Sequence, residues 1–183
     1  LTGARDLRLS GKFSAAHTRL QDPLKARPND ASLLLSLALT LIEQALVEPA
    51  RAYLALALAA KGDRLGAEAA LARVAPDDPT WDELRVRIGL CLGTGPEGQP
   101  QVTRELALRH LQRGPDEPGR KRLWALAEAA TWPTSGTLAP LPARTACLDA
   151  LLEAVRTAPP DLIEASLQEL AHLSLRADLL TPS

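Results

Sequence analysis

The chain has very few of the apolar residues that favour β-strands. Among 183 residues there are three Ile, five Val, one Phe and one Tyr. β-Branched and aromatic side chains are the ones that fill pleated sheets. Their scarcity excludes a β-sandwich, a barrel or a doubly wound α/β fold.

The chain also has no large excess of positive or negative residues, and it has few cysteines. The net charge is −1 and the pI is about 6.4, whereas a chain that binds nucleic acid electrostatically shows a basic stripe or a pI above about 9. Two cysteines, Cys91 and Cys147, are too few for a disulfide framework, although a single bridge between them stays open. The three histidines lack the spacing of a metal site. We therefore expect no metal and no cofactor.

Long apolar runs are absent as well. The longest mainly apolar stretch without a charge, residues 31–42, has 12 residues, well short of the roughly 20 that cross a bilayer. No basic start followed by an apolar run resembles a signal peptide. The chain also lacks Met, even at position 1, so we expect a piece of a larger protein. We expect that protein to be bacterial and located in the cytoplasm, without insertion in a membrane.

Leucine and alanine dominate what is present: 37 Leu and 32 Ala. Both are strong helix formers, and Pro and Gly interrupt them about once per helix length. The pattern predicts an all-α fold with helix content above about 65%. Predicted helices, with Pro, Gly and Asp residues at their ends, span residues 3–10, 14–27, 31–46, 49–61, 64–74, 79–92, 101–113, 119–130, 143–157 and 160–178.

Two stretches of the sequence contain helix pairs that resemble the tetratricopeptide repeat, a helix–turn–helix unit of about 34 residues. The first match carries Gly11, Phe13, Ala16, Leu20 and Pro28, with Pro23 where the family usually has Ala. The second match carries Gly62, Ala67, Leu71 and Pro79.

The glycines of the two matches are 51 residues apart, which is one and a half repeats. Either an extra helix lies between the matches, or residues 31–64 form a degenerate repeat with Ala45 in the place of the turn glycine. The sequence leaves the register between 31 and 79 open.

The resemblance covers residues 3–92 and implies a right-handed stack of antiparallel helical hairpins, an α-solenoid of nine or ten helices. We expect repeats in residues 1–94, and in residues 95–183 further helix pairs that continue the stack, with a loop over 131–142.

The resemblance further implies a non-catalytic protein–protein interaction module, which binds another polypeptide or itself. The alternative is a regulatory, effector-sensing or self-association segment of a transcriptional regulator. Helices 31–46 and 49–61 are apolar on nearly every face, so they lie in the centre of the stack or turn one side to a partner.

Two groups of side chains are candidates for contact. The apolar first-helix face, with the only tyrosine as anchor, comprises Leu35, Leu39, Ile42, Tyr53 and Leu56. A competing basic patch for nucleic acid comprises Arg104, Arg109, Arg113, Arg120 and Arg122. We expect Leu37 and Leu41 in the core, and Trp132 either clamps its loop or stands exposed as a binding anchor.

Overall fold

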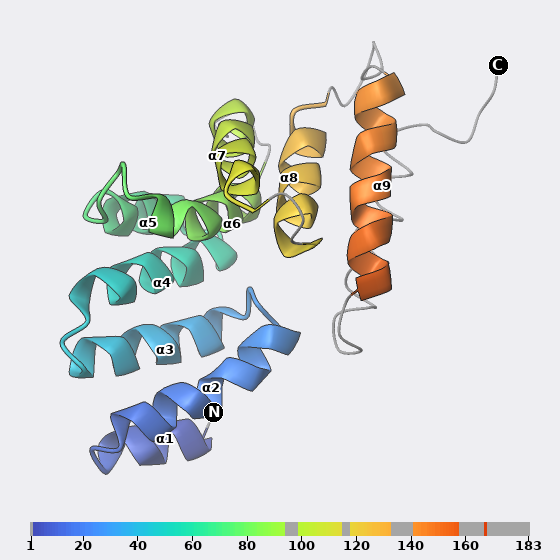
Figure 1. The fold of residues 1–183 in the computed structure, drawn as a ribbon. Coiled ribbons are helices and arrows are strands. Elements are labelled where there is room, and N and C mark those ends of the chain that lie inside the picture. Colours follow the sequence, from blue (N-terminus) through green and yellow to red (C-terminus); the bar gives the residue numbers. More distant parts are fainter. Residues whose placement is uncertain (1, 94–98, 115–117, 133–140, 158–166, 168–183) are drawn as a thin grey trace. The chain divides into compact units, whose positions relative to one another are not determined.

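The computed structural model describes residues 2–93, 99–114, 118–132, 141–157 and 167, and in this part every regular element is helical (Figure 1). Helices make up 81% of the described residues, which confirms the all-α prediction. The predicted helix 160–178 lies, apart from residue 167, outside the described residues, as do positions 133–140 of the predicted loop. The elements are α1 (Thr2–Leu9), α2 (Phe13–Ala26), α3 (Ala31–Glu43), α4 (Val47–Ala60), α5 (Arg64–Leu71), the 3-10 turn η1 (Pro79–Trp81), α6 (Asp82–Leu92), α7 (Pro100–Gln112), α8 (Pro118–Ala130) and α9 (Leu141–Thr157).

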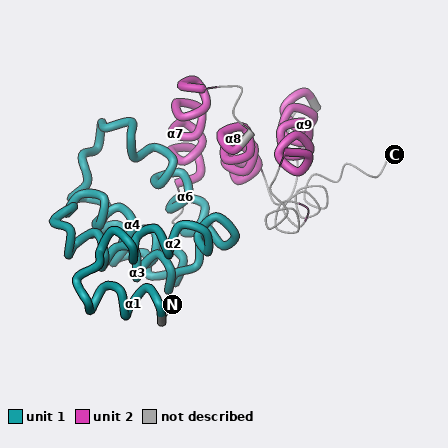
Figure 2. Tube along the Cα trace, turned by 60° about the horizontal axis from the view of Figure 1, so that its bottom comes forward, with its two compact units in different colours: residues 1–92 teal, residues 93–183 magenta. Residues whose placement is uncertain are grey.

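The chain divides into two compact units, residues 1–92 and 93–183 (Figure 2). The division falls two residues before the boundary expected from the Gly-rich and Pro-rich stretch after Leu92. In unit 1, α2 packs on α1 and α3, and α4 packs on α3, α5 and α6. In unit 2, α8 packs on α7 and α9. That unit 2 continues the stack of unit 1 stays a prediction.

Three connections in unit 1 share one backbone geometry, and we call them the left-handed connections. They join α1 to α2, α3 to α4 and α4 to α5, and they contain Gly11, Ala45 and Gly62 at φ values of +74°, +61° and +79°. Gly11 and Ala45 are 34 residues apart, and Ala45 and Gly62 are 17 apart. Ala45 therefore has the conformation of the turn glycine, although its Cβ makes that conformation costly.

The hydrogen bonds of the left-handed connections also repeat. The residue after each left-handed residue donates its N–H to the carbonyl five positions back: Lys12 to Leu7, Leu46 to Leu41 and Asp63 to Leu58, at 2.9–3.0 Å. The left-handed residue itself donates to the carbonyl three positions back, at 2.9–3.0 Å. These two bonds form the Schellman motif, which satisfies carbonyls at a helix end. They explain why α3 ends at Glu43 and α4 begins at Val47, where we had predicted one helix to 46 and the next from 49.

A buried alanine follows each left-handed connection. The N–H groups of Ala16, Ala50 and Ala67 donate to the carbonyls of Lys12, Leu46 and Asp63 at 3.0–3.1 Å, which closes the first turn of each following helix. All three alanines are buried. A methyl group is the side chain that lets two helices approach closely just after a tight turn.

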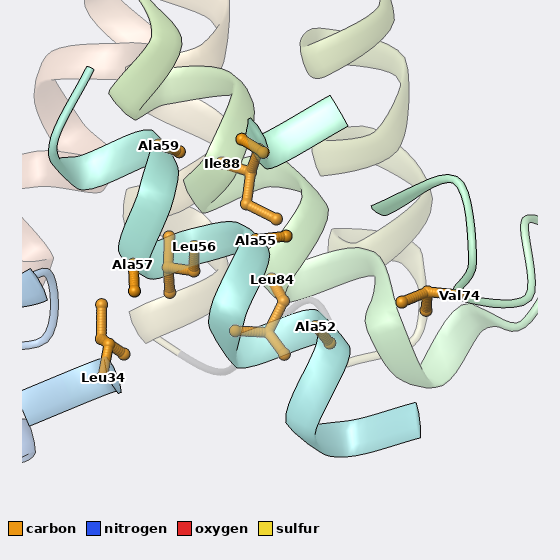
Figure 3. Packing of buried hydrophobic residues seen from close by; sticks show 10 residues of the cluster. Leu34, Ala52, Ala55, Leu56, Ala57, Ala59, Val74, Leu84 and Ile88 are labelled. Carbon is orange, nitrogen blue, oxygen red and sulfur yellow. The ribbon is translucent and has the colours of Figure 1, made fainter. Parts of the chain in front are cut away.

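The core of unit 1 is built around α4. Its buried side chains are mostly alanines, and Leu56 joins them (Figure 3). Figure 3 also shows Leu84 and Ile88 of α6 beside this helix. A second cluster joins α1, α2 and α3 to the start of α4, and Leu37 and Leu41 lie in it, as predicted. Of the two helices that are apolar on nearly every face, α4 is therefore the central one.

Polar ties over long sequence distances hold α6 and the loop before it. Arg87 donates to the carbonyl of Pro28 and, at 3.1 Å, to the side chain of Asn29, so α6 is fastened to the α2–α3 turn. Arg85, itself buried, donates to the carbonyls of Ala75 and Asp78. Arg85 thus adds a side-chain donor to two loop carbonyls that also accept a backbone N–H, and Arg87 supplies a donor to the carbonyl of Pro28.

The core of unit 2 joins α8 to α9. Ala125 and Ala129 of α8 pack with Cys147 and Leu151 of α9, and buried Trp132 closes the cluster. Of the two alternatives for Trp132, the structure therefore favours the one in which it clamps the chain after α8.

We predict that Ala45→Gly stabilises the protein by about 0.5–1 kcal/mol, because glycine adopts a positive φ without the Cβ clash and the relief exceeds the gain in unfolded-state entropy. The matched control is Ala69→Gly in α5, exposed and at an ordinary helical φ, which should lose a similar amount. Urea unfolding of both variants measures this. If both substitutions change the free energy of unfolding in the same direction, residue 45 does not have a positive φ.

Leu37→Ala should destabilise the protein by about 2–5 kcal/mol, because it opens a cavity in the α1–α3 cluster. Leu39→Ala, two residues away on the exposed side of the same helix, should cost less than about 1 kcal/mol. Thermal or urea unfolding distinguishes the two. A small loss for Leu37→Ala would place α3 at the periphery.

Candidate binding surface

The outward side of α3 carries an apolar stripe, made of Leu35, Leu39 and Ile42, that is partly exposed. Leu39 is 40% exposed and Ile42 is 51% exposed, while Leu35 is half-buried against the core. Ser32 and Ser36 lie on the same side, and the Ser36 hydroxyl donates to the carbonyl of Ser32 at 2.9 Å. The stripe therefore combines apolar side chains with small neutral ones.

The other two residues of the predicted face, Tyr53 and Leu56, lie on α4 and differ in how far they are buried. Leu56 is 0% exposed and sits in the core cluster around α4, so including it in a contact surface was wrong. The error arose because the sequence does not show which side of an all-apolar helix turns inward. Tyr53 is half-buried between the two core clusters. Burial raises the pKa of its hydroxyl, with Arg87 opposing and Glu83 adding to the shift.

Leu46 and Val47 are exposed apolar residues that the sequence prediction missed. One of the two repeat registers places Ala45 at a turn, but the predicted helix 31–46 runs through it, and so the exposure of Leu46 and Val47 is not predicted. Leu46 also lines an open hollow beside the stripe. The remaining lining residues are Gly11, Lys12, Phe13, Ser14, Ala15 and Gln44.

The five arginines of the predicted basic patch lie on or next to α7 and α8 of unit 2. Arg104 pairs with Glu128 across these two helices. The Arg120 guanidinium lies where a Cβ on residue 114 would stand. Arg109, Arg113 and Arg122 also interact with other protein groups. Each of the five arginines therefore already interacts with another group of the protein.

Both cysteines are free thiols. Burial raises the pKa of the Cys147 thiol to about 12; the nearby Glu128 adds to this and Arg104 opposes it. Burial also raises the pKa of the Cys91 thiol, with Arg87 opposing. A thiol must ionise to attack, so neither environment activates a nucleophile.

His17 is half-buried on α2 and His110 is buried on α7, whereas His172 lies outside the described residues. In the part that the structure describes, no three His, Cys, Asp or Glu side chains gather where they could hold a metal ion. None of the described helices combines the length and apolarity needed to cross a bilayer.

A scan of protein-family models and searches of curated proteins and of solved structures found no match to this chain.

Ionisation of Cys147 should make the folding stability depend on pH. The folded thiol has the raised pKa and the unfolded thiol the ordinary one near 8.5, so the contribution is complete below pH 8.5 and is lost as pH rises toward 12. Between these values the loss approaches about 1.4 kcal/mol per pH unit. Urea unfolding at several pH values, with Cys147→Ala as reference, measures it. If the free energies of unfolding of the two proteins change in parallel with pH, the thiol of Cys147 is not buried in its neutral form.

Proposed function

We propose that this chain is a non-catalytic protein-interaction module, built as a tetratricopeptide-like stack, which binds an apolar segment of another polypeptide. Three connections with the same hydrogen bonds, 34 and 17 residues apart, support the repeat. They are the regularity expected when one helix–turn–helix unit is used repeatedly along a chain.

The observation that carries the binding role is the exposed stripe of α3. Leu39 and Ile42 are exposed, whereas Leu37 and Leu41 of the same helix are buried in the core. Large exposed apolar patches mark interaction sites in folded proteins, and Leu39 and Ile42, three residues apart on α3, would form the centre of such a patch. Leu35 and Tyr53, half-buried beside the core, would form the floor of the contact.

The mechanism is passive. Helices tied to each other by packing and by Arg87 and Arg85 hold the stripe in place before a partner arrives. Association then loses little conformational entropy on this side of the interface. A second copy of the chain would use the same stripe, as the self-association alternative requires.

The partner can be captured with a photo-reactive phenylalanine analogue at position 39, and with the same analogue at Leu65 as the control. Leu65 is 79% exposed but lies on α5, away from the stripe in the sequence. We expect a cross-link from position 39 only. Titration calorimetry with the identified partner should then show that Leu39→Ser with Ile42→Ser weakens binding by about tenfold or more.

Equal cross-links from both positions, or unchanged affinity of the double variant, would contradict the proposal. A cross-link between copies, lost in the double variant, would select self-association. Nucleic acid provides the opposing test. Micromolar binding of DNA or RNA at physiological salt, abolished by Arg120→Ala with Arg122→Ala, would overturn the proposal in favour of the basic patch.

A further inference from the structure

The open hollow of unit 1 lies between two left-handed connections. Gly11, Lys12 and the first turn of α2 line one side, and Gln44 and Leu46 line the other. Figure 1 shows the α1–α2 and α3–α4 connections on the same side of the unit. Arg8 and Glu43, paired at 3.4 Å, tie the ends of α1 and α3 together behind them.

Apolar side chains meet water at this hollow. Phe13 and Leu46 line it, and Leu46 is 45% exposed. Leu9 and Val47, close to these residues in the sequence, are exposed too. A ligand that covers this edge would remove apolar surface from water, which is favourable in proportion to the area covered.

The polar character of the hollow is positive. Lys12 is the only charged residue that lines it, and within the described part of the chain no ion pair is recorded for this ammonium group. Lys12 and Leu46 occupy the N-cap positions of α2 and α4, and neither side chain caps its helix. The N–H groups of each first turn therefore donate no hydrogen bond to the N-cap side chain, and the dipole of each helix places its positive end here.

Carboxylates of the protein itself are directed elsewhere. Glu43 pairs with Arg8, and Glu48 accepts the N–H of Ala75 at 3.0 Å. By contrast, the N-termini of α3 and α5 are capped by Asp30 and Asp63. A carboxylate is therefore the group that complements the lysine and the two uncapped helix ends.

We propose that the hollow docks a segment of a partner polypeptide that carries a carboxylate one or two residues from a large apolar side chain. The apolar side chain would cover Phe13 and Leu46, and the carboxylate would lie near Lys12 and the first turn of α2. The hollow is open rather than enclosed, which suits a passing chain better than a small metabolite. This inference rests on the proposed function and adds the chemistry of the partner.

The test is a titration of the ¹⁵N-labelled full chain with the peptide acetyl-Leu-Glu-Leu-amide at millimolar concentration, followed by NMR. We expect shifts of the amide signals of Phe13, Ser14, Ala15 and Leu46. The same peptide with Gln in place of Glu should bind about two- to fivefold more weakly, because it loses the interaction with the helix ends and Lys12. Octanoate, a carboxylate on an apolar chain without a peptide backbone, is the third probe.

Two variants test the site without unfolding the protein. Lys12→Asp supplies a cap and a carboxylate of its own, so it should raise the melting temperature and weaken peptide binding about fivefold or more. Leu46→Ser removes apolar surface and caps α4, with the same two effects. Leu65→Ser is the control and should leave peptide binding unchanged.

Three results would overturn the inference. They are unchanged amide signals at the residues that line the hollow, equal affinities for the Glu and Gln peptides, and unweakened binding of the peptide to the Lys12→Asp variant. Binding of octanoate as tight as that of the peptide would overturn the polypeptide assignment. The Leu39→Ser with Ile42→Ser protein separates the two proposals. Suppose that this double variant no longer binds the captured partner, and that neither the unmodified protein nor any variant binds the peptide. The proposed binding role of the stripe is then supported, and the proposed site in the hollow is contradicted.

Discussion

The close approach of helices at the left-handed connections is the constraint on which the rest of unit 1 depends. Each connection reverses the backbone through one residue of positive φ, and the next helix begins with its N-cap carbonyl bonded to a buried alanine. Ala16, Ala50 and Ala67 leave room only for a methyl group at these points. With α2, α4 and α5 held this way, leucines fill the remaining space.

The charged residues of unit 1 serve this packing. Arg87 donates to a loop carbonyl far away in the sequence, and Arg85 donates to two carbonyls of the loop just before α6. Arg64 donates to the last carbonyl of α6 at 3.1 Å, and Glu48 accepts an N–H from the α5–α6 loop. An arginine can reach several carbonyls at once because its guanidinium carries five donors. The apolar stripe of α3 and the hollow beside it are left facing water, which is why binding is assigned to them.

Local chemistry made most of the fold predictable from the sequence. Asp30, Pro79, Gly62 and Gly93 mark helix ends, and scarce strand formers excluded sheets. What escaped prediction depends on packing at long range. The repeat spacing offers Ala45 as a turn residue in one of two registers, but an alanine side chain does not itself favour a positive φ, so the sequence could not choose between the registers. The inward turn of Leu56 and the targets of Arg87 depend on helices that lie elsewhere in the chain.

The left-handed connections are tested most directly by measuring φ at residues 11, 45 and 62 in solution, from three-bond couplings and backbone chemical shifts of the labelled chain. We expect a positive φ at all three positions, including the alanine, with the amide of the following residue protected from exchange. A right-handed helical φ at Ala45, continuous with α3 and α4, would contradict the repeated connection and with it the stack and the hollow derived from it.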